Sequence, residues 1–312
     1  MMKSVKSASL FFNAEYATGL RLAREAREYF RTHSDVSQIG RWGLNHAIYA
    51  QCVMARTYWH QGRFDRTLEA CISTHAEAEE TGNPTWICQA LSWCGCSLFP
   101  NLEELDRAAV AIQRCRQVAQ DNNIQSYLFW SIGFEGRLLF MRGDIEPAER
   151  LLREALSKLN GAQFENAYIP VLGRLAELLI ADGRPEEALL ASAEGLERTR
   201  ATEALWLLPH VLRVHGNVLV SLEGPDSKSA EAYLRQSIDV SERQEALGWE
   251  LGSAESLANL LRQQRRHEEA SAALDRTLGK FVEGFEAIPF RRAKTMLDEL
   301  RQTASSEGAR HS

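Results

Sequence analysis

Residues 176–196, AELLIADGRPEEALLASAEGL, predict one helix, a tight turn and the start of a second helix. Leu175 and Leu179 lie four residues apart on an apolar stripe with helical spacing. Gly183 is expected to end this helix, because glycine readily adopts the left-handed conformation that follows a helix end. Pro185 is expected to begin the next helix, since the first helical position needs no amide donor. Most of the chain repeats this helix–turn–helix design.

Four columns of residues recur with a period of about 40 residues. Small residues that let two helices approach closely stand at Ala55, Gly95, Gly136, Ala176, Gly216 and Ala258. A large apolar residue follows three positions later, at Tyr58, Leu98, Leu139, Leu179, Leu219 and Leu261. Turn signals come next, at Gly62, Pro100, Gly143, Gly183, Gly224 and, without glycine, Arg265. Each second helix then carries a small residue near its start, at Thr67, Ala108, Ala148, Ala188, Ala230 and Ala270.

These columns predict an all-α helical-repeat solenoid, a right-handed superhelix of about seven helical pairs. Residues 1–38 are expected to hold a truncated first repeat, and residues 39–284 six complete repeats. Residues 285–302 are expected to form a capping helix over the last repeat, followed by a frayed polar tail at 303–312.

Composition narrows the class of protein. An apolar fraction of 45% over 312 residues supports a large core, and a net charge of −6 argues against broad nucleic-acid binding. No run of about 18 apolar residues occurs, so no membrane-spanning segment is predicted. Six cysteines at irregular spacing and no secretory signal predict a reduced, cytoplasmic setting.

The sequence offers no motif for catalysis or for a cofactor. It lacks the phosphate-binding pattern G-x-x-x-x-G-K-[ST], the zinc pattern H-E-x-x-H and a serine nucleophile elbow. Cys94 and Cys96 invite a metal hypothesis, but side chains two apart on a helix diverge by about 200°. Buried apolar cysteines are the preferred interpretation. We therefore expect no enzyme activity, no cofactor and no metal.

The column pattern resembles that of tetratricopeptide repeats, with helices about one turn longer per pair than that family's usual period of about 34 residues. Residues 207–300 are similar to the C-terminal repeat region of large bacterial signalling regulators, through the segments WEL at 249–251, SLANLL at 256–261 and FVEGFE at 281–286. Those regulators place a nucleotide cyclase or winged-helix domain and a P-loop ATPase before such repeats. Neither is found in this sequence, so the resemblance implies a sensor or interaction region.

Tetratricopeptide arrays bind extended peptides or helices in a concave groove lined by their first helices. The resemblance therefore implies a partner-binding groove formed by Tyr49, Arg56, Trp59, Trp130, Arg137, Glu177, His210, Arg213, Asn217, Glu255 and Asn259. Aromatic and arginine side chains commonly anchor protein partners. The alternative is that these polar groups only pair with one another across adjacent helices.

A truncated first repeat would leave its apolar residues incompletely covered. On this reasoning an N-terminal interface is expected at Leu10, Phe11, Phe12, Tyr16 and Leu20, because contiguous exposed apolar patches mark interaction sites. A second copy of the chain or a separately encoded module would cover it.

The sequence thus favours a non-enzymatic scaffold or sensor in bacterial signalling or transcriptional regulation, with a protein or peptide partner. Nucleic acid and membrane are not expected partners. The alternative function is a small-molecule effector sensor that relays closure of the superhelix to a cyclase, ATPase or regulator partner. One deep apolar pocket with converging charges would favour that alternative.

Overall fold

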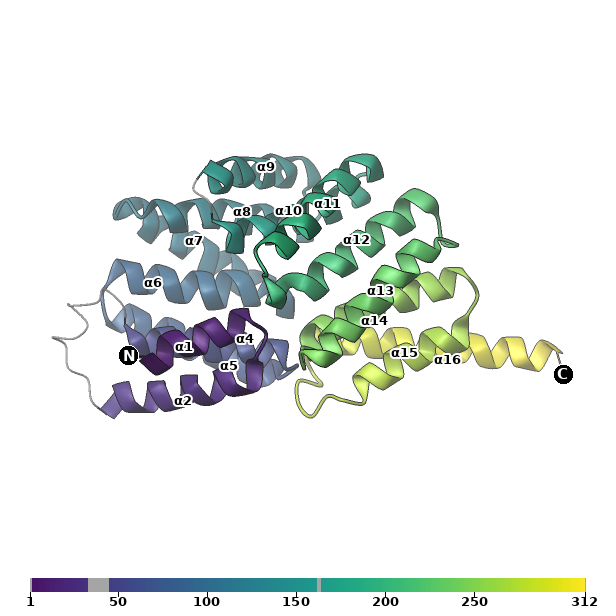
Figure 1. The fold of residues 1–312 in the computed structure, drawn as a ribbon, viewed down its shortest axis with the longest axis horizontal. Coiled ribbons are helices and arrows are strands. Elements are labelled where there is room, and N and C mark those ends of the chain that lie inside the picture. The colour runs from purple at the N-terminus through teal and green to yellow at the C-terminus, as the bar shows by residue number, and fades with distance from the viewer. Residues whose placement is uncertain (1, 33–44, 162–163, 312) are drawn as a thin grey trace. The chain divides into compact units, whose positions relative to one another are not determined.

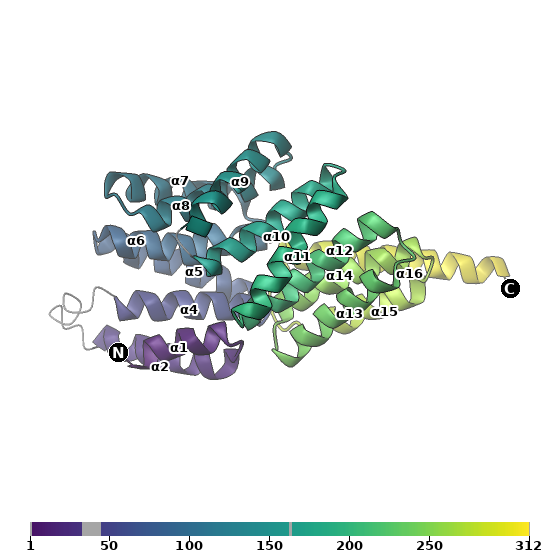
Figure 2. The same ribbon diagram turned by 45° about the horizontal axis from the view of Figure 1, so that its top comes forward.

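The computed structural model describes residues 2–32, 45–161 and 164–311 (Figures 1 and 2). The chain forms two compact units, Met1–Val171 and Leu172–Ser312, whose boundary falls inside one helix. The described residues contain helices and no strand, so the predicted all-α repeat class is confirmed. Among these residues, no helix has the length and apolar character needed to cross a membrane.

The first unit consists of antiparallel helical pairs. Its helices are α1 (Met2–Phe12), α2 (Tyr16–Thr32), α4 (His46–His60), α5 (Phe64–Glu80), α6 (Pro84–Ala90) with its π-helical continuation η1 (Leu91–Cys96), the 3-10 turn η2 (Pro100–Leu102), α7 (Leu105–Asp121), α8 (Gln125–Met141) and α9 (Ile145–Gly161). The boundary between the units lies within α10 (Glu165–Ala181).

The second unit continues the same design. Its helices are the end of α10, α11 (Pro185–Ala201), the 3-10 turn η3 (Leu205–Leu207), α12 (Leu208–Glu223), α13 (Lys228–Arg243), α14 (Leu247–Gln263), α15 (His267–Leu278) and α16 (Ile288–His311). We call α4, α6–η1, α8, α10, α12 and α14 the first helices, and the helix that follows each one its second helix.

Most first helices end in the same turn. After α4, Gly62 has a φ of 72° and the amide of Arg63 donates to the carbonyl of Tyr58 at 2.8 Å. This pairing satisfies a carbonyl that the helix end would otherwise leave open. The turn after α14 forms identically without glycine: Arg265 has a φ of 61°, and Arg266 N lies 2.9 Å from the Leu261 oxygen.

The interval of 41 residues from Gly95 to Gly136 has a local cause. In η1 the backbone takes π-helical bonding, which accommodates one additional residue. The turn therefore closes on the carbonyl of Phe99, to which Glu104 N donates at 2.9 Å, and not on that of Leu98. The predicted column residue Leu98 is thus displaced by one position.

Close contact between a first helix and its second helix explains the column of small residues. A β-carbon on Gly136 would lie 3.1 Å from Leu152 N and 3.2 Å from the carbonyl oxygen of Ala148. One on Gly216 would lie 3.0 Å from the Leu234 side chain. Larger residues at these positions would separate the two helices.

The chain ends differ from the prediction in two respects. Helix α1, of 11 residues, packs against α2 and α4, and this contact buries Phe11, Tyr16 and Leu20 to 0%, 2% and 6% exposure. The predicted exposed patch is therefore wrong for these three residues, while Leu10 and Phe12 are half-buried. At the other end, α16 packs on α14 and α15 and stays helical to His311, through the tail predicted to fray.

A glycine pair tests the packing. A β-carbon on Gly95 would meet the Ala111 β-carbon at 2.7 Å and the His75 ring at 2.5 Å, whereas one on Gly195 would meet nothing closer than 3.9 Å. Gly95→Ala should lower the free energy of unfolding by about 1–3 kcal/mol. Gly195→Ala should leave it unchanged or raise it by up to about 1 kcal/mol, because alanine favours helix. Thermal and urea unfolding followed by circular dichroism measure both; equal stability of the two variants would contradict this account.

Candidate functional site

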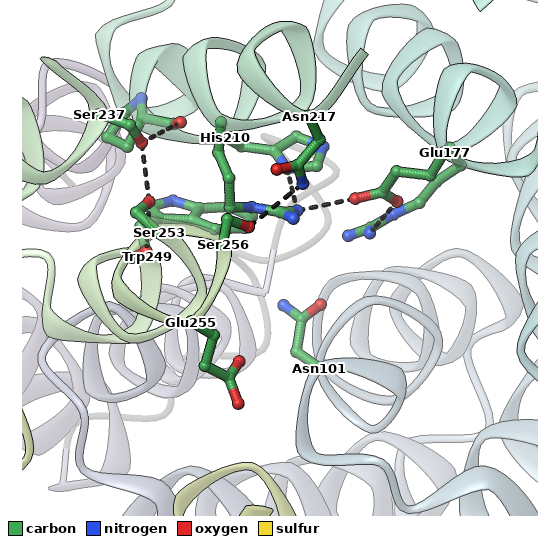
Figure 3. A network of polar contacts seen from close by, with 12 residues as sticks. Asn101, Glu177, His210, Asn217, Ser237, Trp249, Ser253, Glu255 and Ser256 are labelled. Carbon is green, nitrogen blue, oxygen red and sulfur yellow. Dashed lines mark hydrogen bonds and ion pairs between the residues drawn. The ribbon is translucent and has the colours of Figure 1, made fainter. Parts of the chain in front are cut away.

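The first helices of the second unit carry a connected set of charged side chains. Glu177 accepts hydrogen bonds from Arg174, on the same helix, and from Arg213 of α12, each with an N–O distance of 2.7 Å (Figure 3). Their side chains are 16–17% exposed. We call these three residues the Glu177 network. It links α10 to α12 and carries two positive charges against one negative charge.

Arg213 is held in position by α14 as well as by Glu177. Its Nη2 lies 3.3 Å from Nδ1 of His210, and the His210 ring stacks on Trp249 at 4.9 Å with an interplanar angle of 19°. Gly173 leaves room for His210, because a β-carbon at this position would lie only 2.7 Å from its Nε2. A β-carbon on Gly252 would lie 3.7 Å from Nε of Arg213, an ordinary packing distance.

The two arginines decide the charge state of Glu177. Burial alone would raise the pKa of its carboxyl, but Arg174 and Arg213 outweigh burial and hold that pKa well below its ordinary value of 4.5. The carboxylate is therefore ionised throughout the physiological range.

Two amide side chains extend this polar face. Asn217 Nδ2 donates to Ser256 Oγ at 3.1 Å, which connects α12 to α14 (Figure 3). Asn259 accepts a hydrogen bond at Oδ1 from Arg262 at 3.0 Å. Each amide therefore has one end engaged by the protein.

Glu255 pairs with the last helix. Its two carboxylate oxygens accept hydrogen bonds from Nε and Nη2 of Arg292, both at 2.9 Å, and its side chain is 13% exposed. Burial raises the pKa of Glu255 to about 7, and the positive charge of Arg213 opposes that shift. The pair of Glu255 with Arg292 fixes α16 to α14.

The first helices of the first unit present aromatic side chains. The Trp93 ring lies 5.5 Å from that of Tyr49, and the guanidinium carbon of Arg56 lies 5.3 Å from the Trp93 ring and 5.0 Å from that of Phe11. These distances suit cation–π contact. Tyr49, Arg56 and Trp93 are all half-buried.

Helix α8 adds a second group of rings. Trp130, Phe134 and Arg137 recur at three- and four-residue spacing, so they share one helix face, and each is half-buried. Arg137 donates to the carbonyl of Ser97 at 3.3 Å and to Oδ1 of Asn101 at 2.6 Å. We call Tyr49, Arg56, Trp93, Trp130, Phe134 and Arg137 the aromatic face.

Comparison with known proteins agrees with this geometry. A model of the tetratricopeptide repeat matches residues 48–67 and 170–189, which in both cases cover a first helix, its turn and the start of a second helix. The fold is that of a tetratricopeptide-repeat array. No curated protein matches this sequence.

Several solved structures share the fold. A Rap protein complexed with competence and sporulation factor has a TM-score of 0.63 and 13% identity, over 99% of this chain and 89% of that one. The Rap conjugation gene regulator of plasmid pLS20, in complex with the Phr* peptide, gives 0.65 and 13%, over 95% and 73%. NprR in complex with its cognate peptide NprX gives 0.61 and 16%, over 98% and 84%. At these identities the similarity establishes the fold alone.

Most residues predicted for the groove reach the surface. Nine are half-buried: Tyr49, Arg56, Trp130, Arg137, Glu177, Arg213, Asn217, Glu255 and Asn259. The other two are buried, Trp59 at 4% exposure and His210 at 1%. Trp59 packs edge-on against His60 at 5.0 Å, and His210 supports Arg213 from beneath. Neither ring is available to a partner in this arrangement.

The polar residues also pair across adjacent helices, as the alternative interpretation predicted. Arg213 reaches back to Glu177, Asn217 reaches forward to Ser256, and Arg137 reaches back to Asn101. Pairing and ligand contact are compatible here, because the paired side chains of the Glu177 network remain partly exposed. The pairing fixes their orientation in advance of binding.

Five contributors to these faces were not predicted as site residues, and Phe134, four residues after Trp130 on the same helix face, is one of them. Arg174 lies three residues before Glu177 on one helix, so ion-pair spacing could have identified it. Trp93 lies in the π-helical segment η1. This segment changes the angular position of its side chains, so α-helical spacing in the sequence could not identify Trp93 as a residue of this face. Ser256 lies in a segment whose pattern indicated only helix packing, and Arg292 lies in the segment predicted to form the C-terminal capping helix.

The cysteines are buried, as expected. Cys52, Cys71, Cys88, Cys94, Cys96 and Cys115 are free and fully buried in the first unit. Burial raises the pKa of the Cys52, Cys71 and Cys96 thiols. Within the described ranges, no group of three or more histidine, cysteine or acidic residues is placed to hold a metal ion.

The ion pairs predict strong coupling between Glu177 and Arg213. Glu177→Gln and Arg213→Gln should each lower the free energy of unfolding at pH 7 by about 1–3 kcal/mol, because each leaves charged groups in a poorly hydrated site. The double variant should lose less than the sum, with a coupling energy of at least about 1 kcal/mol. Urea unfolding measures the cycle; additive losses would show that the pair contributes nothing.

The same pair sets a pH dependence. Because the folded pKa of Glu177 is depressed, its contribution is complete above the unfolded value of about 4.5 and declines as the pH falls toward the folded value. Below pH 4.5, Glu177→Gln should therefore lose less stability with acid than the natural chain does.

Thiol reactivity tests the burial of the cysteines. In the folded chain a chromogenic thiol reagent should react with fewer than one of the six cysteines within minutes, since neither reagent nor water reaches them. All six should react in denaturant. Rapid modification of two or more in the folded chain would show that the first unit opens more readily than its packing implies.

Proposed function

We propose that this chain is a non-enzymatic regulatory scaffold that binds a peptide, or a peptide segment of another protein, along the half-buried faces of its first helices. The comparisons support this proposal, because three proteins of this fold were solved with a bound peptide or factor. The similarity in sequence to bacterial signalling regulators supports a role in signal-dependent control of a partner protein.

The observation that carries the proposal is the amide pair Asn217 and Asn259. They occupy the same column in successive first helices, and both are half-buried. Asn217 donates to Ser256, and its Oδ1 accepts no hydrogen bond from the described residues. Asn259 accepts from Arg262, and its Nδ2 donates none within the described ranges.

Such amides suit an extended backbone. A peptide strand presents N–H donors and C=O acceptors, and an asparagine offers both complements in one side chain. Asn217 has an acceptor to offer and Asn259 a donor, one repeat apart. Charged residues around them, held by their own ion pairs, would lose little conformational entropy when a peptide binds.

Peptide selection tests the proposal. The purified chain is used to select binders from a displayed random-peptide library, and the affinities of the selected peptides are measured by calorimetry. Asn217→Ala and Asn259→Ala should each weaken binding about 5- to 30-fold, the equivalent of one or two lost hydrogen bonds.

Gln113→Ala, on the exposed side of the second helix α7, provides the matched control and should bind as the natural chain does. Failure of any peptide to enrich above a no-protein control would contradict the proposal. So would enriched peptides that bind the two asparagine variants with undiminished affinity.

A further inference from the structure

The cysteines of the chain are concentrated in one part of the first unit. All six fall between residues 52 and 115, on α4, α5, α6–η1 and α7. They form two groups of three, and in each group a central thiol lies within hydrogen-bonding distance of the other two: Cys94 with Cys52 and Cys71, and Cys115 with Cys88 and Cys96. Neither the Glu177 network nor the amide pair of the second unit involves them. We therefore asked what chemistry two compact groups of thiols allow.

Cys88 and Cys115 lie opposite each other on α6 and α7. Sγ of Cys88 is 3.8 Å from the carbonyl oxygen of Cys115, and Sγ of Cys115 is 3.9 Å from the carbonyl oxygen of Cys88. Each thiol therefore already reaches the backbone of the other residue. Among the described cysteines, this pair alone has such reciprocal contacts. A disulfide needs two backbones at close range, because its Cα atoms are usually about 4.4–6.8 Å apart.

A serine of the same helix holds the Cys115 thiol in place. Oγ of Ser92 lies 3.2 Å from Sγ of Cys115. Cys88, Ser92 and Cys96 follow one another at intervals of four residues, and all three contact Cys115. The sulfur of Cys115 therefore has little freedom to turn away from Cys88.

Burial determines when these thiols can react. Cys88 and Cys115 are both 0% exposed. Thiol–disulfide exchange requires the outside disulfide to reach a protein sulfur atom, and neither sulfur of this pair lies at the surface. Exchange is therefore expected to be fast while the chain folds and slow once α6 has packed on α7.

We propose that Cys88 and Cys115 form a dithiol–disulfide couple whose redox state is set while the chain folds and is then retained by burial. The oxidant is a low-molecular-weight disulfide such as oxidised glutathione. The thiolate of one cysteine attacks a glutathione sulfur, the glutathione S–S bond breaks, and one glutathione thiolate leaves. The thiolate of the other cysteine then attacks the protein sulfur of this mixed disulfide and releases the second glutathione. Two electrons pass from the protein to the oxidised glutathione, and the two cysteine protons end on the two glutathione thiols.

The bond would join α6 covalently to α7 across 27 positions of the sequence. Such a crosslink stabilises a protein mainly by restricting its unfolded chain, and more so for a longer loop. Because α6 continues directly into η1, the bond would also restrain the π-helical segment that carries Trp93. The couple thus gives the chain two forms of one fold that differ in the stability of the first unit.

Refolding under defined redox conditions tests the inference. The reduced chain is unfolded in denaturant and refolded by dilution into equal, millimolar concentrations of reduced and oxidised glutathione. Free thiols are then blocked with iodoacetamide in denaturant, and disulfides are mapped by mass spectrometry of proteolytic peptides. At least about 80% of the chain should carry the Cys88–Cys115 bond. Its unfolding midpoint by circular dichroism should exceed that of the reduced chain by at least about 4 °C.

A second arm measures retention. The chain that is already folded and reduced is placed in the same glutathione buffer, and the bond is quantified over time. It should form at least about tenfold more slowly than in the refolding chain, because the outside disulfide does not reach the packed thiols.

Alanine variants verify which thiols are involved. Cys88→Ala and Cys115→Ala should each lose the bond and the gain in unfolding midpoint. Cys71→Ala, which changes an equally buried cysteine of the other group, is the matched control and should retain both.

If an alanine variant does not fold, the peptide map of the natural chain decides the test by itself. The inference is overturned if oxidising refolding leaves all six thiols free, or if the mapped bond joins a different pair of cysteines. It is also overturned if the oxidised chain is less stable than the reduced one, or if the folded, reduced chain oxidises as fast as the refolding chain.

Discussion

The close contact between each first helix and its second helix is the constraint on which the structure depends. At Gly136 the two backbones are so near that a β-carbon would lie 3.1 Å from a main-chain nitrogen. This proximity fixes which face of the first helix turns toward its partner helix. The left-handed residue that follows then returns the chain directly into the second helix, so one small residue and one turn define each repeat.

The candidate faces of the first helices follow from that contact. Once the small residue is turned toward the second helix, the next residue in sequence points away from it, as Arg137 and Glu177 do. In the first unit Arg56 lies between the rings of Phe11 and Trp93, and in the second unit Glu177 and Asn217 take part in ion pairs and amide hydrogen bonds. One geometric rule thus places two chemically different surfaces on equivalent helices.

Most of the architecture could be predicted because helical periodicity and small residues report helix contacts directly. The repeat columns predicted the positions of the turns. The turn at Arg265 forms although glycine is missing, because tertiary packing outweighs the cost of placing a residue with a side chain in the left-handed conformation. Burial of Phe11 could not be predicted in the same way. It depends on packing of α1 against α4, a contact between two helices that α2 separates in the sequence.

For the candidate faces, the repeat pattern predicted which column of residues contributes, but it did not predict which residues pair with one another. The position of Arg213 follows from its spacing, but its contact with Glu177 requires the distance between α10 and α12. Trp93 was missed because a π-helical turn changes the angular register, and such a turn has no reliable sequence pattern. Both cases concern geometry between repeats, which a single-repeat pattern does not contain.

The left-handed turn residues have a further consequence. Among the residues that the structure describes, six of them are not glycine: Ala14, Glu103, Asn123, Glu203, Glu245 and Arg265. Side chains in this conformation cost roughly 1 kcal/mol each relative to glycine, so the array carries several small, separate losses distributed along its length. A globular core would concentrate such losses in one cooperative unit, whereas an array confines each to its own junction. These junctions are hence the places where the molecule can be made more rigid one step at a time, without altering any residue of the two candidate faces.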